Sequence, residues 1–124
     1  MSWISILIIV LFLAAFFGLK RLGLVSAGIA RKYLKEGAWV VDVRSAEEFR
    51  AGHLPDAVNF PLGELQDCLP RRVSDKNQVL LLHCLSGMRS GMARRALKAM
   101  GYTRVFDLGS LGRAQKIVGP SGST

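Results

Sequence analysis

Cysteine is scarce in this chain, which has only Cys68 and Cys84 among its 124 residues. Two cysteines do not make the disulfide framework of a small secreted domain or a structural zinc site, and no metal is implied. The sequence also shows no internal repeat. Its length leaves room for one small domain, and its hydrophobic content of 50% is enough to build a core.

Charge is absent from the N-terminal segment, because the first charged side chain is that of Lys20. All 17 lysine and arginine residues and all 9 acidic residues therefore belong to the rest of the chain, together with the net charge of +8. A basic balance favours anionic partners, such as lipid head groups, acidic proteins, nucleic acid or small anions. No RNA- or DNA-binding motif is present, so we expect no nucleic-acid partner.

The uncharged segment from Trp3 to Leu19 is apolar, and its 17 residues are at the short end of what spans a bilayer, roughly 17–25. Lys20 and Arg21 follow at once, and no basic residue precedes the segment. The positive-inside rule then places the rest of the chain in the cytoplasm. We therefore predict a single-pass membrane protein in which residues 1–21 form a transmembrane anchor with a basic flank, so that the membrane is one of its partners.

A cleaved signal peptide is the main alternative for this segment, because Val25-Ser26-Ala27 has the small residues of a cleavage site. However, its first residues carry no side-chain charge, and the basic pair lies on the wrong side of the apolar run. These two features favour the anchor.

A second pattern surrounds Cys84. Val79 to Leu82 is a short apolar run, which is typical of a strand covered on both faces. We expect Ser90 to cap a following helix from Gly91 to Met100. The loop between strand and helix can then turn its backbone N–H groups toward the Cys84 sulfur, next to a helix N-terminus, where an anion is stabilised.

This arrangement suits nucleophilic chemistry at sulfur, because the thiolate is the reactive form of cysteine. Gly87 permits the backbone that a small loop requires, and Arg89 adds a permanent positive charge. The alternative is that Cys84 is an ordinary small core residue in a strand-to-helix turn.

A third pattern is the predicted strand from Trp39 to Val43. Asp42 and Arg44 lie at its carboxyl end, where α/β sheets place their sites. We expect a supporting structural role for both, with Asp42 accepting backbone donors and Arg44 forming an ion pair with an acidic residue nearby. The candidates for that pair are Glu47, Glu48 and Asp56.

Three motifs in this order resemble the signatures of single-domain rhodaneses, which are sulfurtransferases. Cys84 to Ser90 is similar to the active-site loop of that family. Val40 to Arg44, followed by Glu47 to Phe49, resembles its first signature, and Gly52 to Pro61 resembles its second. The resemblance runs from about Val25 to Leu111.

The alternation of strands and helices predicts an α/β fold with a mostly parallel sheet and helices on both faces. The resemblance implies that this fold is rhodanese-like, and here it would follow one transmembrane helix. We expect residues 22–118 to form the rhodanese domain and residues 119–124 to be a disordered tail.

The resemblance also implies a double displacement, in which Cys84 takes a sulfane sulfur from a donor, becomes a persulfide and passes the sulfur on. The donor would be a small sulfur-containing anion or a persulfide, and the acceptor a thiol or a protein. No metal or organic cofactor is implied. The residues expected to bind the substrate are Leu85, Ser86, Gly87, Met88 and Arg89.

Two other functions remain open. The first is a phosphatase or arsenate reductase on the same fold, because the loops of cysteine phosphatases also run from His-Cys to Arg. Those loops have one residue more between Cys and Arg than the segment Leu85 to Met88 provides, and the shorter loop suits sulfur better than phosphate. The second is a non-catalytic rhodanese-like binding module, against which the retained Cys84, Gly87 and Arg89 argue.

Overall fold

The structure, a computed structural model, describes residues 2–119. Its centre is a four-stranded sheet with the order β2-β1-β3-β4, in which every neighbouring pair is parallel. The strands are β1 (Trp39–Asp42), β2 (Val58–Asn59), β3 (Leu80–His83) and β4 (Val105–Gly109).

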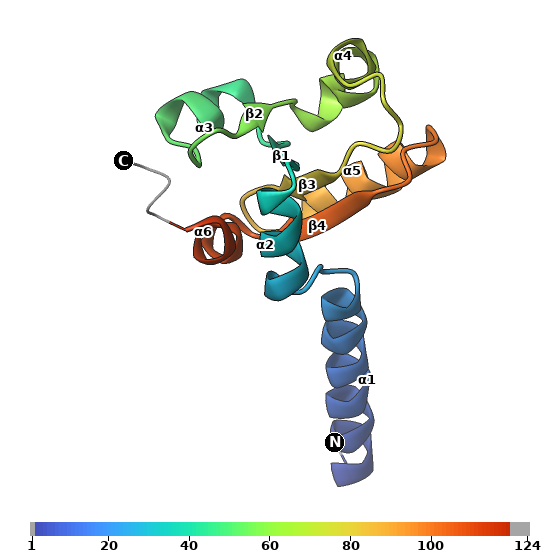
Figure 1. The fold of residues 1–124 in the computed structure, drawn as a ribbon. Coiled ribbons are helices and arrows are strands. Elements are labelled where there is room, and N and C mark those ends of the chain that lie inside the picture. Colours follow the sequence, from blue (N-terminus) through green and yellow to red (C-terminus); the bar gives the residue numbers. More distant parts are fainter. Residues whose placement is uncertain (1, 120–124) are drawn as a thin grey trace.

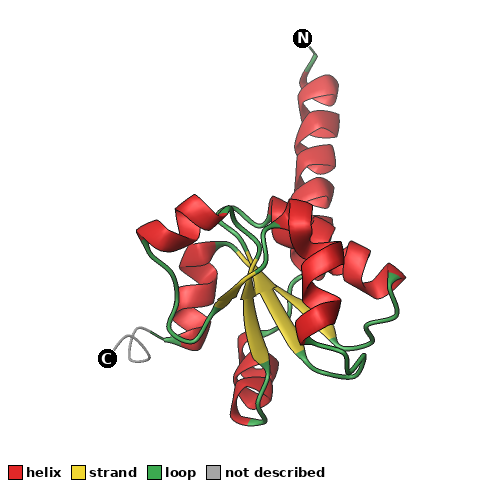
Figure 2. Cartoon of the chain, turned by 90° about the horizontal axis from the view of Figure 1, so that it is seen from above, coloured by secondary structure: helices red, strands yellow, loops and turns green. Residues whose placement is uncertain are grey.

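Helices cover both faces of this sheet, as Figure 2 shows. The predicted α/β fold with a parallel sheet is therefore confirmed. The helices are α1 (Trp3–Leu22), α2 (Ala27–Lys35), α3 (Ala46–Ala51), the 3-10 turn η1 (Leu62–Glu64), α4 (Leu65–Arg72), α5 (Met88–Ala99) and α6 (Leu111–Val118).

Side chains along β3 alternate between two apolar cores, because successive residues of a strand point to opposite faces. Leu80 and Leu82 pack into the core that α4 and α5 cover, and Cys84 continues this series. Leu81 packs into the other core, with residues of α2 and α6. The strand period therefore directs the Cys84 side chain toward the α5 side of the sheet.

Helix α5 begins earlier than the sequence pattern predicted. Gly87, with a φ of 98°, is the N-cap, and Met88 is the first helical residue. Ser90 therefore lies inside the first turn and is not the cap. The left-handed backbone of Gly87, which side-chain-bearing residues rarely adopt, allows the loop to enter the helix at this point.

Helix α4 contains a proline, a residue that commonly ends or kinks a helix. Pro70 lies within α4, which continues to Arg72. The backbone N–H of Val73 donates to the Leu69 carbonyl at 2.8 Å and closes the last turn beyond the proline. The missing proline N–H thus removes one hydrogen bond without ending the helix.

Helix α6 was not predicted, although its N-cap is visible in the sequence. The Ser110 side chain accepts a hydrogen bond from the Arg113 N–H at 3.2 Å. Arg113 then donates to the carbonyls of Leu108 and Val25. One arginine therefore ties the start of α6 to β4 and to the segment before α2.

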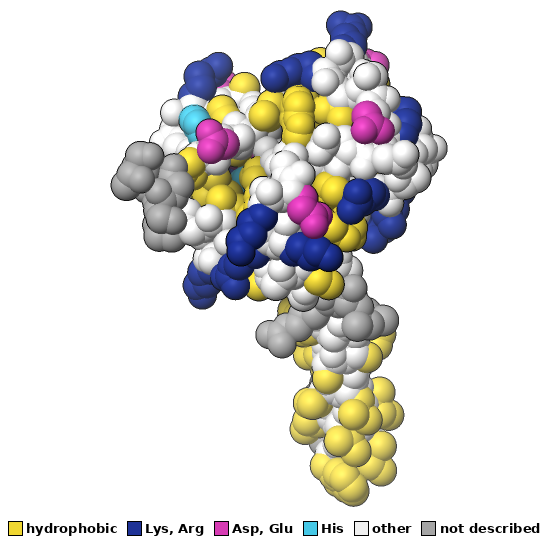
Figure 3. All heavy atoms as spheres, viewed as in Figure 1, with side chains coloured by type: hydrophobic (Ala, Val, Ile, Leu, Met, Phe, Trp, Pro, Cys, Tyr) yellow, Lys and Arg dark blue, Asp and Glu magenta, His cyan; other side chains and the backbone are white. Residues whose placement is uncertain are grey.

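Helix α1 extends away from the sheet in Figure 1, and its hydrophobic side chains are visible in Figure 3. Trp3 and Phe12, for example, are 73% and 69% exposed. Nevertheless, within residues 2–119 no helix combines the length and the apolar character that crossing a bilayer requires.

The predicted transmembrane anchor and single-pass membrane location are therefore wrong, and the membrane partner that depended on them is not supported. The physical reason is length, because the uncharged run ends at Leu19, before Lys20 and Arg21. At about 1.5 Å per helical residue, such a run measures about 25 Å, less than the roughly 30 Å of a hydrocarbon core. Apart from Gly119, which caps α6, the predicted tail over residues 119–124 lies outside the described residues.

The buried hydroxyl of Tyr102 gives a test of the packing between α5 and the loop after α4. Tyr102 is 1% exposed and donates to the Val73 carbonyl. We expect Tyr102→Phe to lower the free energy of unfolding by about 1–3 kcal/mol in urea denaturation, because the carbonyl loses its partner. Tyr33→Phe is the matched control, since Tyr33 is held by stacking on Phe106 at 4.9 Å. Equal effects of the two changes would contradict this account.

Candidate active site

Two backbone N–H groups converge on the Cys84 sulfur, directly after β3. The residue is fully buried. Its Sγ accepts hydrogen bonds from the Gly87 N–H at 3.0 Å and from the Ser90 N–H at 3.4 Å. The loop therefore turns amides toward the sulfur, as the sequence pattern suggested.

The loop is held in this shape by the neighbouring strand end. Cys84 donates its N–H to the Gly109 carbonyl at 3.2 Å, and Leu111 donates to the Leu85 carbonyl at 3.1 Å. A Cβ atom on Gly87 would lie 3.6 Å from the Gly109 backbone, and the left-handed φ of Gly87 would be strained in any other residue. The sulfur also lies beside the N-terminus of α5, whose partial positive charge stabilises a thiolate.

The side chain of Ser90 completes the contacts around the sulfur. Its Oγ lies 3.7 Å from Cys84 Sγ and donates to the Gly87 carbonyl at 3.1 Å. Ser90 was predicted only as a helix cap. In the structure it supports the loop from within the first turn of α5, a role that its sequence position did not reveal.

Arg89 does not point its charge at the sulfur. Its Nη1 lies 2.6 Å from Glu48 Oε1, and its Nη2 lies 3.0 Å from Oε2, so that the two groups form a bidentate pair. This hydrogen-bonded pair lowers the pKa of Glu48 to about 2 and raises that of Arg89. The sequence pattern offered Glu48 only as one of three candidate partners of Arg44. Its contact with Arg89 of the active-site loop was not predicted.

Arg44 instead pairs with Asp42, which corrects the expected pairing with Glu47, Glu48 or Asp56. The Arg44 Nη2 lies 2.7 Å from Asp42 Oδ2, and both side chains are almost fully buried. Asp42 also accepts the Arg44 backbone N–H at 2.9 Å. Arg44 Nη2 then donates to the Gly52 carbonyl at 2.7 Å. The predicted role of Asp42 as a backbone acceptor therefore agrees with the geometry.

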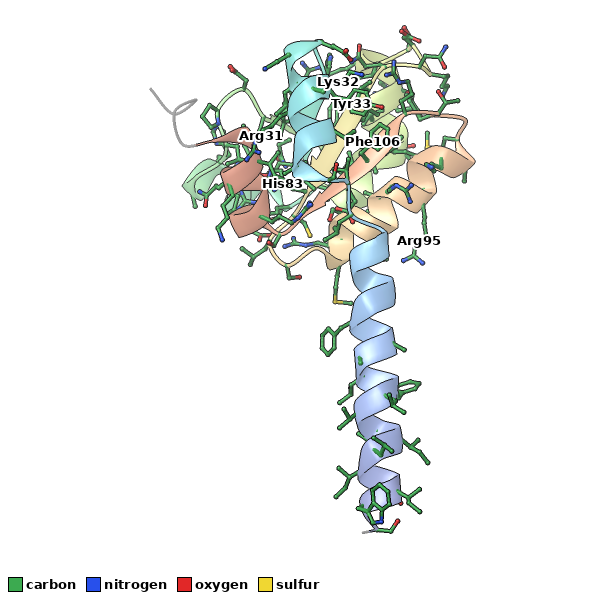
Figure 4. The ribbon with its side chains drawn as sticks, turned by 60° about the horizontal axis from the view of Figure 1, so that its bottom comes forward. Arg31, Lys32, Tyr33, His83, Arg95 and Phe106 are labelled. Carbon is green, nitrogen blue, oxygen red and sulfur yellow. The ribbon has the colours of Figure 1, made fainter. Side chains whose placement is uncertain are left out.

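His83 is the unexpected neighbour of this pair, and Figure 4 marks its position. The residue is fully buried, its Nε2 lies 3.8 Å from Asp42 Oδ2, and this nitrogen has no hydrogen-bond partner among residues 2–119. Burial lowers the pKa of His83, while the Asp42 carboxylate and the Cys84 carbonyl oppose that shift. The histidine before Cys84 is thus kept neutral on the face of the sheet opposite to the sulfur.

Two further residues, His53 and Cys68, have local structural roles. The His53 ring stacks on Phe49 at 3.8 Å and its Nδ1 contacts the Phe49 carbonyl at 2.9 Å, so it fixes the turn after α3. Cys68 is half-buried on α4 and packs against the α5-side core.

A groove of about 800 Å³ borders the active-site loop on the side of α1. Gly87, which donates to the Cys84 sulfur, forms part of its wall, together with Met88 and Met92 of the loop and α5. Arg95 also lines it and lies close to the point where α1 meets the domain (Figure 4). Its volume is in the range of small-molecule sites, roughly 300–1,000 Å³.

The three sequence motifs, the parallel fold and the two amides at Cys84 agree with one protein family. The Rhodanese-like domain family matches residues 26–110. The chain belongs to this family. Thiosulfate sulfurtransferase PspE of Escherichia coli is 38% identical over 71 residues, which are 57% of this chain and 68% of that protein.

Solved structures agree with this assignment. The chain resembles a rhodanese with anions from E. coli, with a TM-score of 0.60 and 35% identity over 62% of this chain and 91% of that one. It also resembles the human single-domain sulfurtransferase TSTD1, with a TM-score of 0.60 and 29% identity over 73% of this chain and 89% of that one. The predicted enzyme class, a rhodanese-type sulfurtransferase, is confirmed.

The buried Asp42–Arg44 pair of this rhodanese domain should be costly to break. We expect Asp42→Ala to lower the free energy of unfolding by about 3–5 kcal/mol in urea denaturation, because the Arg44 charge is left buried without its partner. The double variant Asp42→Asn/Arg44→Met should be less destabilised, since no charge remains. A single variant that costs less than the double one would refute the pairing argument.

The neutral state of His83 predicts a pH dependence of stability. Folding holds the pKa of His83 below its ordinary 6.5, so protons bind more readily to the unfolded chain. This part of the stability is complete above the unfolded pKa and is lost as the pH falls below it. We expect the decline in unfolding free energy from about pH 7.5 to about pH 5 to be smaller in His83→Gln than in the wild type, as measured by urea titrations. Parallel curves would contradict the expectation.

Proposed function

We propose that residues 22–118 transfer a sulfane sulfur through a persulfide on Cys84. The observation that carries this proposal is the convergence of the Gly87 and Ser90 N–H groups on Cys84 Sγ, at 3.0 and 3.4 Å. Donors fixed in this way stabilise negative charge without a separate base. The family membership of the chain supports the same chemistry.

In the first step the Cys84 thiolate attacks the outer sulfur of the donor. A new S–S bond forms at Cys84, the S–S bond of the donor breaks, and its electron pair leaves with the remainder. Thiosulfate would release sulfite, and a persulfide would release a thiolate. The negative charge then lies on the terminal sulfur of the Cys84 persulfide.

In the second step a nucleophilic acceptor attacks that terminal sulfur. The bond to the acceptor forms, the bond to Cys84 Sγ breaks, and the electron pair returns to Cys84 as a thiolate. The acceptor can be cyanide, a thiol or a thiol of a protein. Atoms and charges balance over the two steps, and no cofactor is required.

The loop residues have different parts in this proposal. Gly87 supplies a donor to the sulfur. Leu85, Ser86 and Met88 are uncharged and exposed or close to the groove, so they contact the incoming donor or acceptor. Arg89 is part of the binding site through its pair with Glu48. Asp42 and Arg44 support the loop from the neighbouring strand end.

The two cysteines of the chain provide the direct test. We expect Cys84→Ser to reduce thiosulfate:cyanide sulfurtransferase activity by at least about a thousandfold, because serine is not an anion at neutral pH and is a far weaker nucleophile. Cys68→Ser, the matched control, should retain most of the activity, since Cys68 lies on α4 at the edge of the core.

An aryl-phosphate assay of the same preparations separates the phosphatase alternative. Near-normal sulfur transfer by Cys84→Ser would refute the mechanism. If the wild type hydrolysed aryl phosphate and transferred no sulfur, the phosphatase function would replace the sulfurtransferase proposal.

A further inference from the structure

Glu48 is the residue at the active-site loop whose presence the persulfide mechanism does not explain. We propose that Glu48 determines donor specificity by neutralising Arg89, so that the site favours singly charged sulfane donors, such as alkyl persulfides and thiosulfonates, over the thiosulfate dianion. This inference rests on the proposed function, because it concerns the donor that Cys84 attacks.

The first argument is the geometry of the pair. Both carboxylate oxygens of Glu48 are engaged by Arg89, at 2.6 and 3.0 Å. A bidentate carboxylate–guanidinium contact is directional and stronger than a single hydrogen bond. The Arg89 and Glu48 side chains are 34% and 32% exposed, so an anion in solution can reach the pair.

The second argument is that Glu48 is fixed from its own helix. Its Oε1 accepts the Ser45 N–H at 3.1 Å, and the Ser45 Oγ accepts the Glu48 N–H at 3.1 Å. This capping box holds the carboxylate before Arg89 approaches. Glu48 also lines a cavity of about 410 Å³ beside Gly52 and Leu111, which places its charge next to open space.

The third argument is the balance of charge around the loop. The Arg44 charge is matched by Asp42, and the Arg89 charge is matched by Glu48. The loop side chains Leu85, Ser86 and Met88 carry no charge. Among the loop residues and these two pairs a donor meets backbone amides but no unmatched cation, so the further cations near the loop are those of the groove wall, such as Arg95. The attraction between a cation and a donor grows with the charge of the donor. Neutralising Arg89 therefore weakens the binding of a dianion more than that of a monoanion.

The fourth argument is that Glu48 stays ionised, and so neutralises Arg89, across the pH range in which the protein is assayed. The hydrogen bonds from Arg89 lower the pKa of Glu48 to about 2, so the carboxylate is ionised throughout the range in which a thiolate can act. Glu48 therefore presents a permanent negative charge to an incoming anion.

The test compares Glu48→Gln with the wild type on two donors, thiosulfate as the dianion and benzenethiosulfonate as the monoanion, with cyanide as the acceptor. Glutamine keeps the capping oxygen but removes the charge. We expect the ratio of kcat/KM for thiosulfate to kcat/KM for benzenethiosulfonate to rise about tenfold, mainly through the KM for thiosulfate. The rise should shrink at high salt, because the effect is electrostatic.

Glu47→Gln is the matched control, since it makes the same change in net charge at the neighbouring exposed position and leaves the Arg89 pair intact. We expect it to alter the donor ratio by less than about twofold. In the double variant Glu48→Gln/Arg89→Gln, the rise in the donor ratio should disappear, because the guanidinium that would attract thiosulfate is gone. Thermal denaturation of each variant checks that the fold and the cap are retained.

The inference is overturned if Glu48→Gln changes the ratio no more than Glu47→Gln does, or if it slows both donors equally, as loss of a structural contact would. It is also overturned if the gain survives in the double variant. These outcomes differ from failure of the proposed function, in which the wild type transfers sulfur from neither donor faster than Cys84→Ser does.

Discussion

The site depends on one constraint, the convergence of two backbone N–H groups on the sulfur of Cys84. The strand period of β3 brings the side chain to the α5 side, where Leu80 and Leu82 also pack. The left-handed turn at Gly87 then directs the loop into α5 within a few residues. Because the donors belong to the backbone, their convergence depends on this turn and not on the side chains at the loop mouth.

The charged side chains near these two N–H groups are held in ion pairs. Asp42 and Arg44 form a buried pair at the end of β1, and His83 stays neutral beside them. Glu48 and Arg89 form a second pair at the rim. The Cys84 sulfur is thus contacted by backbone amides at the N-terminus of α5, while the paired side-chain charges hold the surrounding elements in place.

Contacts that are local in the sequence could be predicted, and contacts between elements could not. The parallel fold and the capping box of Ser45 and Glu48 follow from patterns a few residues long. The partner of Arg89 lies 41 residues away, and its identity depends on how α3 packs beside the loop. The sequence offers Arg44 several carboxylates as partners. It pairs with the nearest in sequence, Asp42, because both side chains are buried together. The N-terminal segment was misjudged because apolar character was given more weight than length.

The size of the loop bears on the choice between sulfur and phosphate. Two N–H groups meet at a single atom, Cys84 Sγ, and the Ser90 hydroxyl lies 3.7 Å from the same atom. A tetrahedral oxyanion presents several oxygens in different directions and needs a wider ring of separate donors, together with a free guanidinium. Here the donors are directed at Cys84 Sγ itself, and the guanidinium of Arg89 is held by Glu48. Under the proposed mechanism, two donors that converge on a single atom suit the charge of one sulfur better than the several oxygens of a phosphate.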